Sequence, residues 1–121
     1  MNAKANDDQR TVTFSAPGDL VSTNAETLHR EIGELLDARD EASPKWELFK
    51  LDLTRARIVD SMGLNLIALL LKRVRKNGAK MQVAYAHKNV LRVFIFTRLD
   101  RHVELVNVGS NAPGPGGAGR R

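Results

Sequence analysis

Ser61 is the residue whose type and position best suit chemistry at a hydroxyl group. It follows Asp60 at the start of an apolar segment with helical spacing, Met62 to Lys76. The first N–H groups of a helix have no partner inside it, and the helix dipole is positive at that end. A serine there commonly caps the helix. The same groups can hold a phosphate, which adds a charge near −2, so the position predicts either a cap or a phosphorylation site.

The cysteine, histidine and aspartate content of the chain does not predict a catalytic or metal site. The chain has no cysteine, which excludes disulfides and thiolate chemistry, and His29, His87 and His102 lack metal-site spacing. A Gly-x-Ser-x-Gly nucleophile elbow would need glycine where Val59 stands. Asp52 lacks the acidic pair expected of a phosphoaspartate receiver and is interpreted as a strand-end polar residue. We therefore expect no enzymatic activity, no metal and no cofactor.

Length and hydropathy predict one cytoplasmic domain. The 121 residues suit a single core. The longest apolar run, Leu66 to Leu71, is far shorter than the roughly 18 residues of a membrane span. Met1 to Arg10 is polar and has no secretory apolar region. We expect a soluble protein without a membrane partner.

Basic residues gather near the end of the second predicted helix. Lys plus Arg number 19 and Asp plus Glu number 14, which gives a net charge of +5. Cations at a helix C-terminus complement its dipole, so a solvated face is the favoured interpretation and an acidic protein partner the alternative. Aromatic residues for base stacking are few, so we expect no direct nucleic-acid binding. The cluster comprises Lys72, Arg73, Arg75, Lys76 and Lys80.

The first half of the chain predicts a strand and then a helix. Residues Thr11 to Phe14 favour a strand, followed by a turn at Pro17-Gly18. Thr23 to Glu26 fits a capping box, which would begin a helix that ends before Ser43-Pro44. The apolar stripe of this helix comprises Ala25, Leu28, Ile32, Leu35 and Leu36.

The second half continues the alternation. An apolar run around Leu48 to Leu53 predicts a central strand covered on both faces, and a loop Thr54 to Asp60 precedes the helix that stops at Asn77-Gly78. A further strand, a short helix and a closing strand follow at Met81 to Tyr85, Val90 to Ile95 and Val103 to Val106. The order predicts a single-domain α/β fold, a mostly parallel sheet of four to five strands with three to four helices.

The second helix is unusually apolar around its circumference. Its apolar residues cover an arc of roughly 220°, wider than the stripe of about 100° that one core face requires. Such a helix either lies between two layers or leaves part of its surface for a partner. Both interpretations stay open at this point.

The ends of the chain differ in composition from the middle. Residues 109–121 read GSNAPGPGGAGRR, which buries little apolar surface, so we expect a disordered Gly/Pro-rich tail. Residues 1–10 are expected to be flexible. The folded domain is then predicted over residues 11–108.

Two motifs of this chain form a recognisable pair: Leu51-Asp52-Leu53, and Ile58 to Leu64, which reads IVDSMGL. Together they resemble the signature of STAS domains of the type found in bacterial anti-sigma factor antagonists. Gly18-Asp19-Leu20, the segment Gly78 to Met81 and the segment Val90 to Leu99 follow in the family's order. The family often has an acidic residue where Val21 stands and a glycine near Arg98.

The resemblance implies partner switching. In this family the serine that matches Ser61 is phosphorylated by a serine kinase that doubles as the anti-sigma factor and has a histidine-kinase-like ATPase fold. A serine phosphatase reverses the reaction. Unphosphorylated protein would capture the anti-sigma factor, and phosphate at Ser61 would release it. The ATP belongs to the kinase.

The resemblance and the predicted loops together give a candidate partner-binding surface. Asp60 is expected to shape the loop and to orient the Ser61 hydroxyl, or simply to favour the helix N-terminus by its charge. Gly63 would allow close approach either of a partner or of the fold itself. Ser22 and Thr23 are expected to cap the first helix, with further phosphorylation as the alternative. The surface comprises Asp19, Ser22, Thr23, Asn24, Asp60, Met62, Gly63, Leu64 and Asn65.

One alternative keeps the fold but not the switch. In it the chain is a non-phosphorylated STAS scaffold, or an interaction module in a larger signalling assembly.

Overall fold

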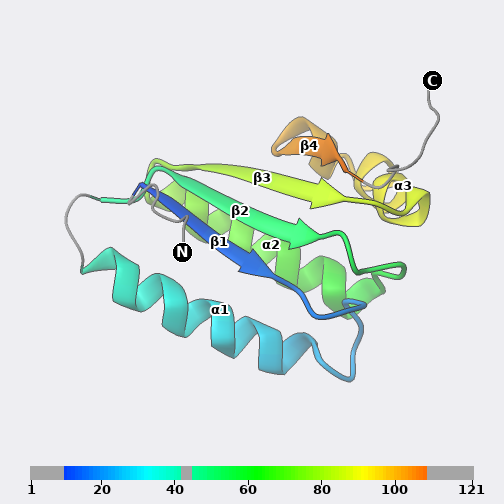
Figure 1. Cartoon of the computed structure of the whole chain (residues 1–121), viewed down its shortest axis with the longest axis horizontal. Helices are drawn as coiled ribbons and strands as arrows, with labels where there is room; N and C mark the ends of the chain where they lie inside the picture. Colours follow the sequence, from blue (N-terminus) through cyan, green and yellow to red (C-terminus); the bar gives the residue numbers. More distant parts are fainter. Residues whose placement is uncertain (1–9, 42–44, 109–121) are drawn as a thin grey trace.

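The computed structural model describes residues 10–41 and 45–108, and strands alternate with helices along them (Figure 1). The tail expected over residues 109–121, nearly all of the flexible N-terminus and Ser43-Pro44 lie outside these ranges. The elements are β1 (Thr11–Ser15), α1 (Ala25–Asp40), β2 (Leu48–Leu53), α2 (Ser61–Lys76), β3 (Lys80–Tyr85), α3 (Lys88–Phe96), the 3-10 helix η1 (Leu99–Arg101) and β4 (Glu104–Asn107).

The strands form one parallel sheet in the order β1-β2-β3-β4. Leu51 of β2 pairs with Phe14 of β1 on one side and with Val83 of β3 on the other, and Val83 pairs with Leu105 of β4. Four parallel strands with three α-helices confirm the predicted fold class, and β2 is an inner strand as expected.

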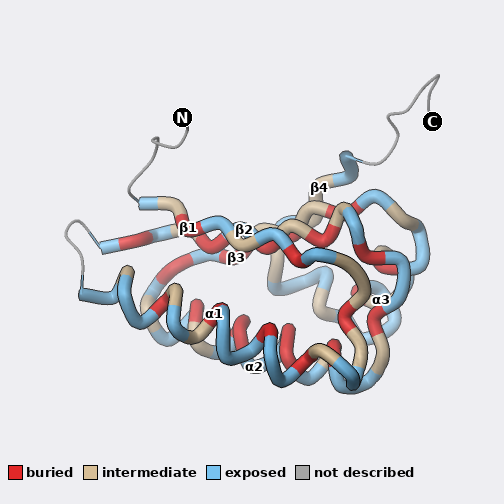
Figure 2. The backbone as a smooth tube through the Cα atoms, turned by 60° about the horizontal axis from the view of Figure 1, so that its bottom comes forward, coloured by how far each residue is buried: buried red, intermediate tan, exposed pale blue. Residues whose placement is uncertain are grey.

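The prediction that β2 is covered on both faces is wrong. Phe49, Leu51 and Leu53 are buried, but Lys50 between them is exposed and Asp52 is only half-buried. Figure 2 shows why, since α1 and α2 lie together on one side of the sheet. Crossovers of the same hand between neighbouring parallel strands place successive helices on one face when the strand order does not reverse. The other face of β2 therefore stays open.

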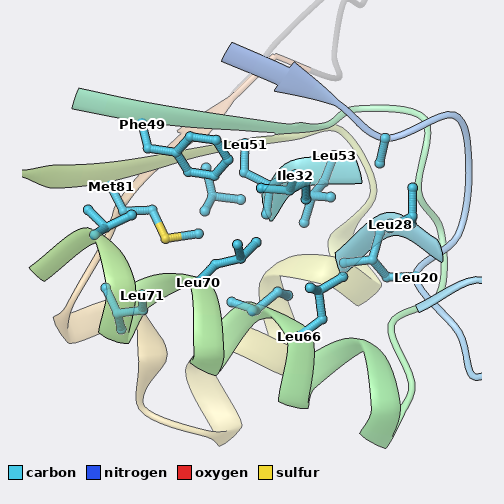
Figure 3. Close-up of a cluster of buried hydrophobic side chains, with 14 of the residues drawn as sticks. Leu20, Leu28, Ile32, Phe49, Leu51, Leu53, Leu66, Leu70, Leu71 and Met81 are labelled. Atoms are coloured by element: carbon cyan, nitrogen blue, oxygen red, sulfur yellow. The ribbon is translucent and has the colours of Figure 1, made fainter. Parts of the chain in front are cut away.

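The core lies between the covered face of the sheet and the two long helices, α1 and α2 (Figure 3). Ile32 of α1 and Leu70 of α2 are almost fully buried against Leu51 and Met81 of the sheet. Burying one large apolar side chain contributes about 1.5–3 kcal/mol. This packing fixes both helices and therefore the position of their N-terminal ends.

The wide apolar arc of α2 leaves surface open beside α1. Its core side is buried, yet Met62 is 49% and Leu69 is 43% exposed. Ser61, Asn65 and Lys72, on the side away from the sheet, are exposed too. Of the two interpretations, partial exposure is confirmed and burial between two layers is wrong.

The predicted capping box at the start of α1 is also wrong. The helix begins at Ala25 with Asn24 as its N-cap, and the Asn24 side chain makes no capping hydrogen bond. Its Oδ1 instead accepts from the Val21 N–H at 3.0 Å, and its Nδ2 donates to the Asp19 carbonyl at 2.7 Å. The asparagine is occupied with ordering the preceding turn, so neither Ser22 nor Thr23 stands at the cap position.

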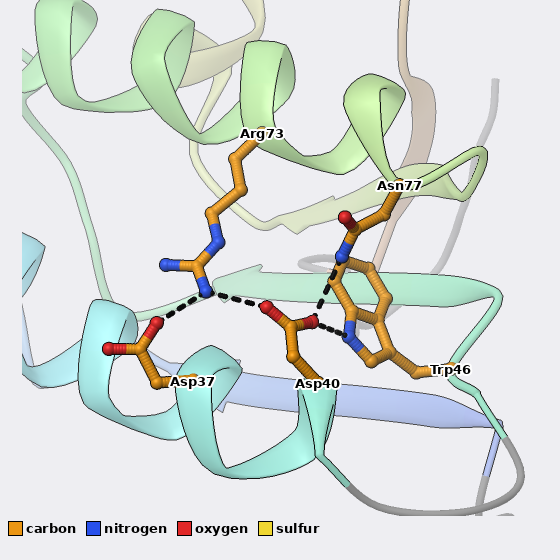
Figure 4. A network of polar contacts seen from close by, with 5 residues as sticks. All are labelled: Asp37, Asp40, Trp46, Arg73 and Asn77. Atoms are coloured by element: carbon orange, nitrogen blue, oxygen red, sulfur yellow. Dashed lines mark hydrogen bonds and ion pairs between the residues drawn. The ribbon is translucent and has the colours of Figure 1, made fainter.

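A polar network joins the C-terminal ends of α1 and α2 (Figure 4). Arg73 donates to Asp37 at 2.6 Å and to Asp40 at 2.9 Å. Trp46 and Asn77 donate to the other oxygen of Asp40 at 2.7 and 3.0 Å. Burial raises the pKa of Asp40, but these hydrogen bonds outweigh it and hold the pKa below its ordinary value. Arg73 is thus a structural cation and not part of a solvated basic face.

Candidate functional site

Ser61 is the first residue of α2, and its side chain is exposed. The cap is its neighbour, since Asp60 Oδ1 accepts from the Gly63 N–H at 2.9 Å. The interpretation of Ser61 as the N-cap is therefore wrong. Within residues 10–41 and 45–108, no hydrogen bond engages the Ser61 hydroxyl. The oxygen is free to meet another molecule.

The second oxygen of Asp60 contacts the loop between β1 and α1, residues 16–24, which we call the first loop. Asp60 Oδ2 accepts from the Ser22 N–H at 2.8 Å. The N–H groups of Gly63 and then of Ser22 lower the pKa of Asp60 below its ordinary value. At neutral pH a carboxylate therefore stands beside the Ser61 hydroxyl, and it is already committed to two backbone donors.

The loops before α1 and α2 are held together by backbone pairing as well. Leu20 and Val59 form a parallel bridge, in which the Leu20 N–H donates to Ile58 and the Leu20 carbonyl accepts from Asp60, each at 3.0 Å. Asp19 Oδ1 accepts from the N–H groups of Arg57 and Ile58 at 2.8 and 3.2 Å. Asp19 therefore orders the loop that leads into Ser61 and α2.

Gly63 is buried where α2 meets Leu20. A Cβ at this position would lie 2.3 Å from the Leu20 carbonyl oxygen and 2.9 Å from its carbonyl carbon. No side chain fits there without moving the backbone. The close approach that Gly63 allows is to the fold's own loop, so its part in the site is to position α2.

The structure brings part of the predicted partner-binding surface together in one groove. Ser22 from the first loop and Met62 and Asn65 from α2 line a shallow hollow of about 330 Å³ between α1 and α2. Thr23 is exposed nearby in the chain, whereas Asp19, Asn24 and Leu64 are half-buried and do not line the groove. The remaining lining residues are Ala25, Glu26, His29, Leu66 and Leu69.

None of the five remaining lining residues was part of the predicted surface. In α1, Glu26 and His29 are three positions apart, and in α2 Leu69 lies four positions after Asn65, which lies three after Met62. Spacings of three and four along each helix would have identified them. The sequence does not reveal that these faces of α1 and α2 are neighbours in the fold.

Comparison with known proteins identifies the family. The model of the STAS domain matches residues 2–112, nearly the whole chain, and the chain belongs to this family. No curated protein sequence is significantly similar to it.

Two solved structures share the fold. A Thermotoga maritima protein, provisionally named an anti-sigma factor antagonist, is 21% identical, with 84% of this chain and 83% of that one covered at a TM-score of 0.70. The STAS domain of a SulP transporter from Vibrio cholerae is 15% identical, with 83% and 76% covered at a TM-score of 0.61.

Among the described residues no three His, Asp or Glu side chains are grouped so that they could hold a metal ion. The helices within those residues are also too short or too polar to cross a membrane.

Proposed function

We propose that this protein is an anti-sigma factor antagonist that works by partner switching. In its unphosphorylated form it binds a serine kinase that is also the anti-sigma factor and has a histidine-kinase-like ATPase fold. Phosphorylation of Ser61 releases that partner, and a serine phosphatase restores the first state. The proposal places the protein in the cytoplasm, where ATP is available to the kinase.

The observation that carries the proposal is the state of the Ser61 side chain. It is exposed, stands at the first position of α2 and makes no hydrogen bond within the described residues. Asp60 already caps the helix, so modification of Ser61 costs the fold no capping interaction. A kinase can transfer the γ-phosphoryl group of ATP to this oxygen without first unfolding the helix end.

The position also supports a strong response to phosphate. A phosphoserine places a charge near −2 beside the Asp60 carboxylate. Asp60 accepts from Ser22 at 2.8 Å, and Ser22 lines the groove with Met62. Repulsion between the two anions therefore weakens the contact that orders the first loop, and the new charge faces any partner docked there.

The groove supplies a surface of the right kind for a protein partner. Its side chains combine the half-exposed apolar Met62 and Leu69 with the polar Ser22 and Asn65. Methionine repacks readily against a partner. We assign the partner contact to this groove together with exposed Thr23, and assign positioning roles to Asp19, Asn24, Gly63 and Leu64.

Phosphate uptake tests the proposal directly. The purified protein is incubated with ATP and each serine kinase of this ATPase class from the source organism, and its intact mass is measured. We expect the wild type to gain one phosphate and Ser61→Ala to gain none. Ser22→Ala, which removes an exposed hydroxyl from the loop that Asp60 contacts, is the matched control and should still gain one phosphate.

The alternative function gives a different result. If no kinase of the class modifies the wild type, while the kinases phosphorylate their own known substrates, the non-phosphorylated scaffold is the better account. Uptake that persists in Ser61→Ala and disappears in Ser22→Ala would instead move the site to the first loop.

A further inference from the structure

The outward side of α3 is an uncovered face within the described part of the chain. The helix buries Val90 and Phe94 in the core. Phe96 is 84% and Ile95 is 51% exposed at its end, and Figure 2 places α3 at the margin of the molecule. We call the five exposed residues of this helix the α3 outer face: Lys88, Asn89, Arg92, Ile95 and Phe96.

The charge of α3 and of the turn that follows it is of one sign, as far as the exposed Asp100 of η1. From Ala86 to Leu99 the chain has no Asp or Glu, while Lys88, Arg92 and Arg98 are cationic and exposed. Helix α1, by contrast, contains five carboxylates and two arginines. Helix α1 packs along β1, whereas α3 packs against β3 and η1, so the acidic and basic regions lie toward opposite edges of the sheet.

We propose that the α3 outer face docks the protein on the surface of an anionic lipid bilayer. Helices that lie at such a surface combine basic side chains with protruding Phe or Leu residues that enter the boundary of headgroups and acyl chains. Phe96 and Ile95 are the apolar anchors here. Lys88, Arg92 and Arg98 approach the anionic headgroups, and their aliphatic stems can lie along the apolar layer.

The composition of the face suits a bilayer. Two apolar side chains, Ile95 and Phe96, protrude at its end, and the charged side chains beside them are all cationic. Helix α3 has nine residues, of which five form its outer face. A bilayer needs no complementary shape, only anchors and counter-charge.

The expectation of no membrane partner rested on the lack of an apolar run long enough to span a bilayer. A helix that lies on the surface needs no such run. The α3 outer face also shares no residue with the groove beside Ser61. The docking proposal therefore does not depend on the proposed switch.

Vesicle co-sedimentation tests the proposal on the full chain. The vesicles are phosphatidylcholine with about one third phosphatidylglycerol, an anionic lipid, beside vesicles of phosphatidylcholine alone. We expect binding to the anionic vesicles that weakens with salt, and little binding to the neutral ones. Arg92→Gln should reduce binding about fivefold, the contribution of one cation near such a surface. Phe96→Ser should reduce it about tenfold.

Two matched variants control for overall charge and for general apolarity. Lys50→Gln removes an exposed cation from the open face of the sheet, and Val108→Ser removes an apolar side chain that is 48% exposed. Each should change binding by less than about twofold. Because all four positions are exposed, the variants should retain the circular dichroism spectrum of the wild type.

Three results would overturn the proposal. One is the absence of sedimentation with anionic vesicles at low salt. Another is a loss in Lys50→Gln as large as that in Arg92→Gln, which would mean that net charge alone attracts the protein. The third is Arg92-dependent binding to poly-glutamate without binding to vesicles, which would make the α3 outer face a site for acidic proteins.

Discussion

The Oδ2 atom of Asp60 accepts a hydrogen bond from the backbone N–H of Ser22 at 2.8 Å, across 38 positions of sequence. The other oxygen of the same carboxylate caps α2 through Gly63. One side chain next to Ser61 therefore holds both the start of α2 and the loop that leads into α1. A charge added at Ser61 acts on both at once.

Removing the Asp60 carboxylate should loosen the first loop. In Asp60→Ala the Ser22 N–H loses its acceptor, and we expect its hydrogen exchange to become roughly fivefold faster. Amide exchange followed by NMR measures this. Asp60→Asn keeps one acceptor oxygen, so its Ser22 exchange rate should lie between those of the wild type and Asp60→Ala. Unchanged exchange at Ser22 in Asp60→Ala would contradict the link.

Replacing Gly63 should destabilise the protein. The added Cβ would lie 2.3 Å from the Leu20 carbonyl oxygen. A backbone atom cannot move away as a flexible side chain can, so either α2 or the loop that contains Leu20 must shift. We expect Gly63→Ala to lower the free energy of unfolding by about 2 kcal/mol, measured by urea denaturation. Gly33→Ala is the control within α1, where the nearest atom is 4.0 Å away. It should raise that free energy by about 0.5–1 kcal/mol.

Arg98, two residues after the end of α3, adopts a left-handed backbone with φ of 65°. This conformation suits glycine, which the family often has near this position. Arg98→Gly should therefore stabilise the fold by about 1 kcal/mol in thermal or urea unfolding. Gly78→Ala is the converse change at φ of 74° and should destabilise by a similar amount, about 1 kcal/mol. A destabilised Arg98→Gly would show that the arginine side chain matters more than its backbone.

Acid should weaken the joint between α1 and α2. Burial raises the pKa of Asp40, but the hydrogen bonds from Trp46, Arg73 and Asn77 lower it further, to below the ordinary 3.8. A carboxyl with a folded pKa below its unfolded one stabilises the protein above the unfolded value, and this stability disappears as pH falls toward the folded pKa.

Urea unfolding across the acid range measures this effect. The contribution of Asp40 to the free energy of unfolding should be constant from neutral pH to about pH 5 and decline below about pH 4. Asp40→Asn should be less stable at neutral pH, with a shallower decline in acid. Parallel acid profiles for the two proteins would contradict the role of Asp40.

The sequence predicted the fold well where local patterns determine it. The apolar spacing of α2 located the helix to within one residue, and Asn77-Gly78 marked its end. Sequence-based prediction of the helix start was wrong for α1, where two local signals competed. Thr23 and Glu26 have the spacing of a capping box, but Asn24 hydrogen-bonds to Val21 and Asp19, and that turn determines where α1 begins.

Contacts between distant segments were beyond sequence reasoning. Nothing in the spacing of Asp60 indicates that it meets Ser22, or that Gly63 packs on Leu20. The same holds for Arg73, which looked like one of several solvated cations and instead pairs with Asp37 and Asp40. The residue type at position 61 was informative, but its hydroxyl is left unbonded because Asp60, not Ser61, caps α2 through Gly63.

The affinity of the serine kinase for this protein tests the switch most directly. It is measured by calorimetry for the unphosphorylated protein, for the protein phosphorylated on Ser61 and for Ser61→Ala. We predict tight binding of the unphosphorylated form and of Ser61→Ala, and binding at least about tenfold weaker after phosphorylation, because like charges at an interface are costly. Equal affinities for the two forms would contradict the claim that phosphate on Ser61 determines which partner binds.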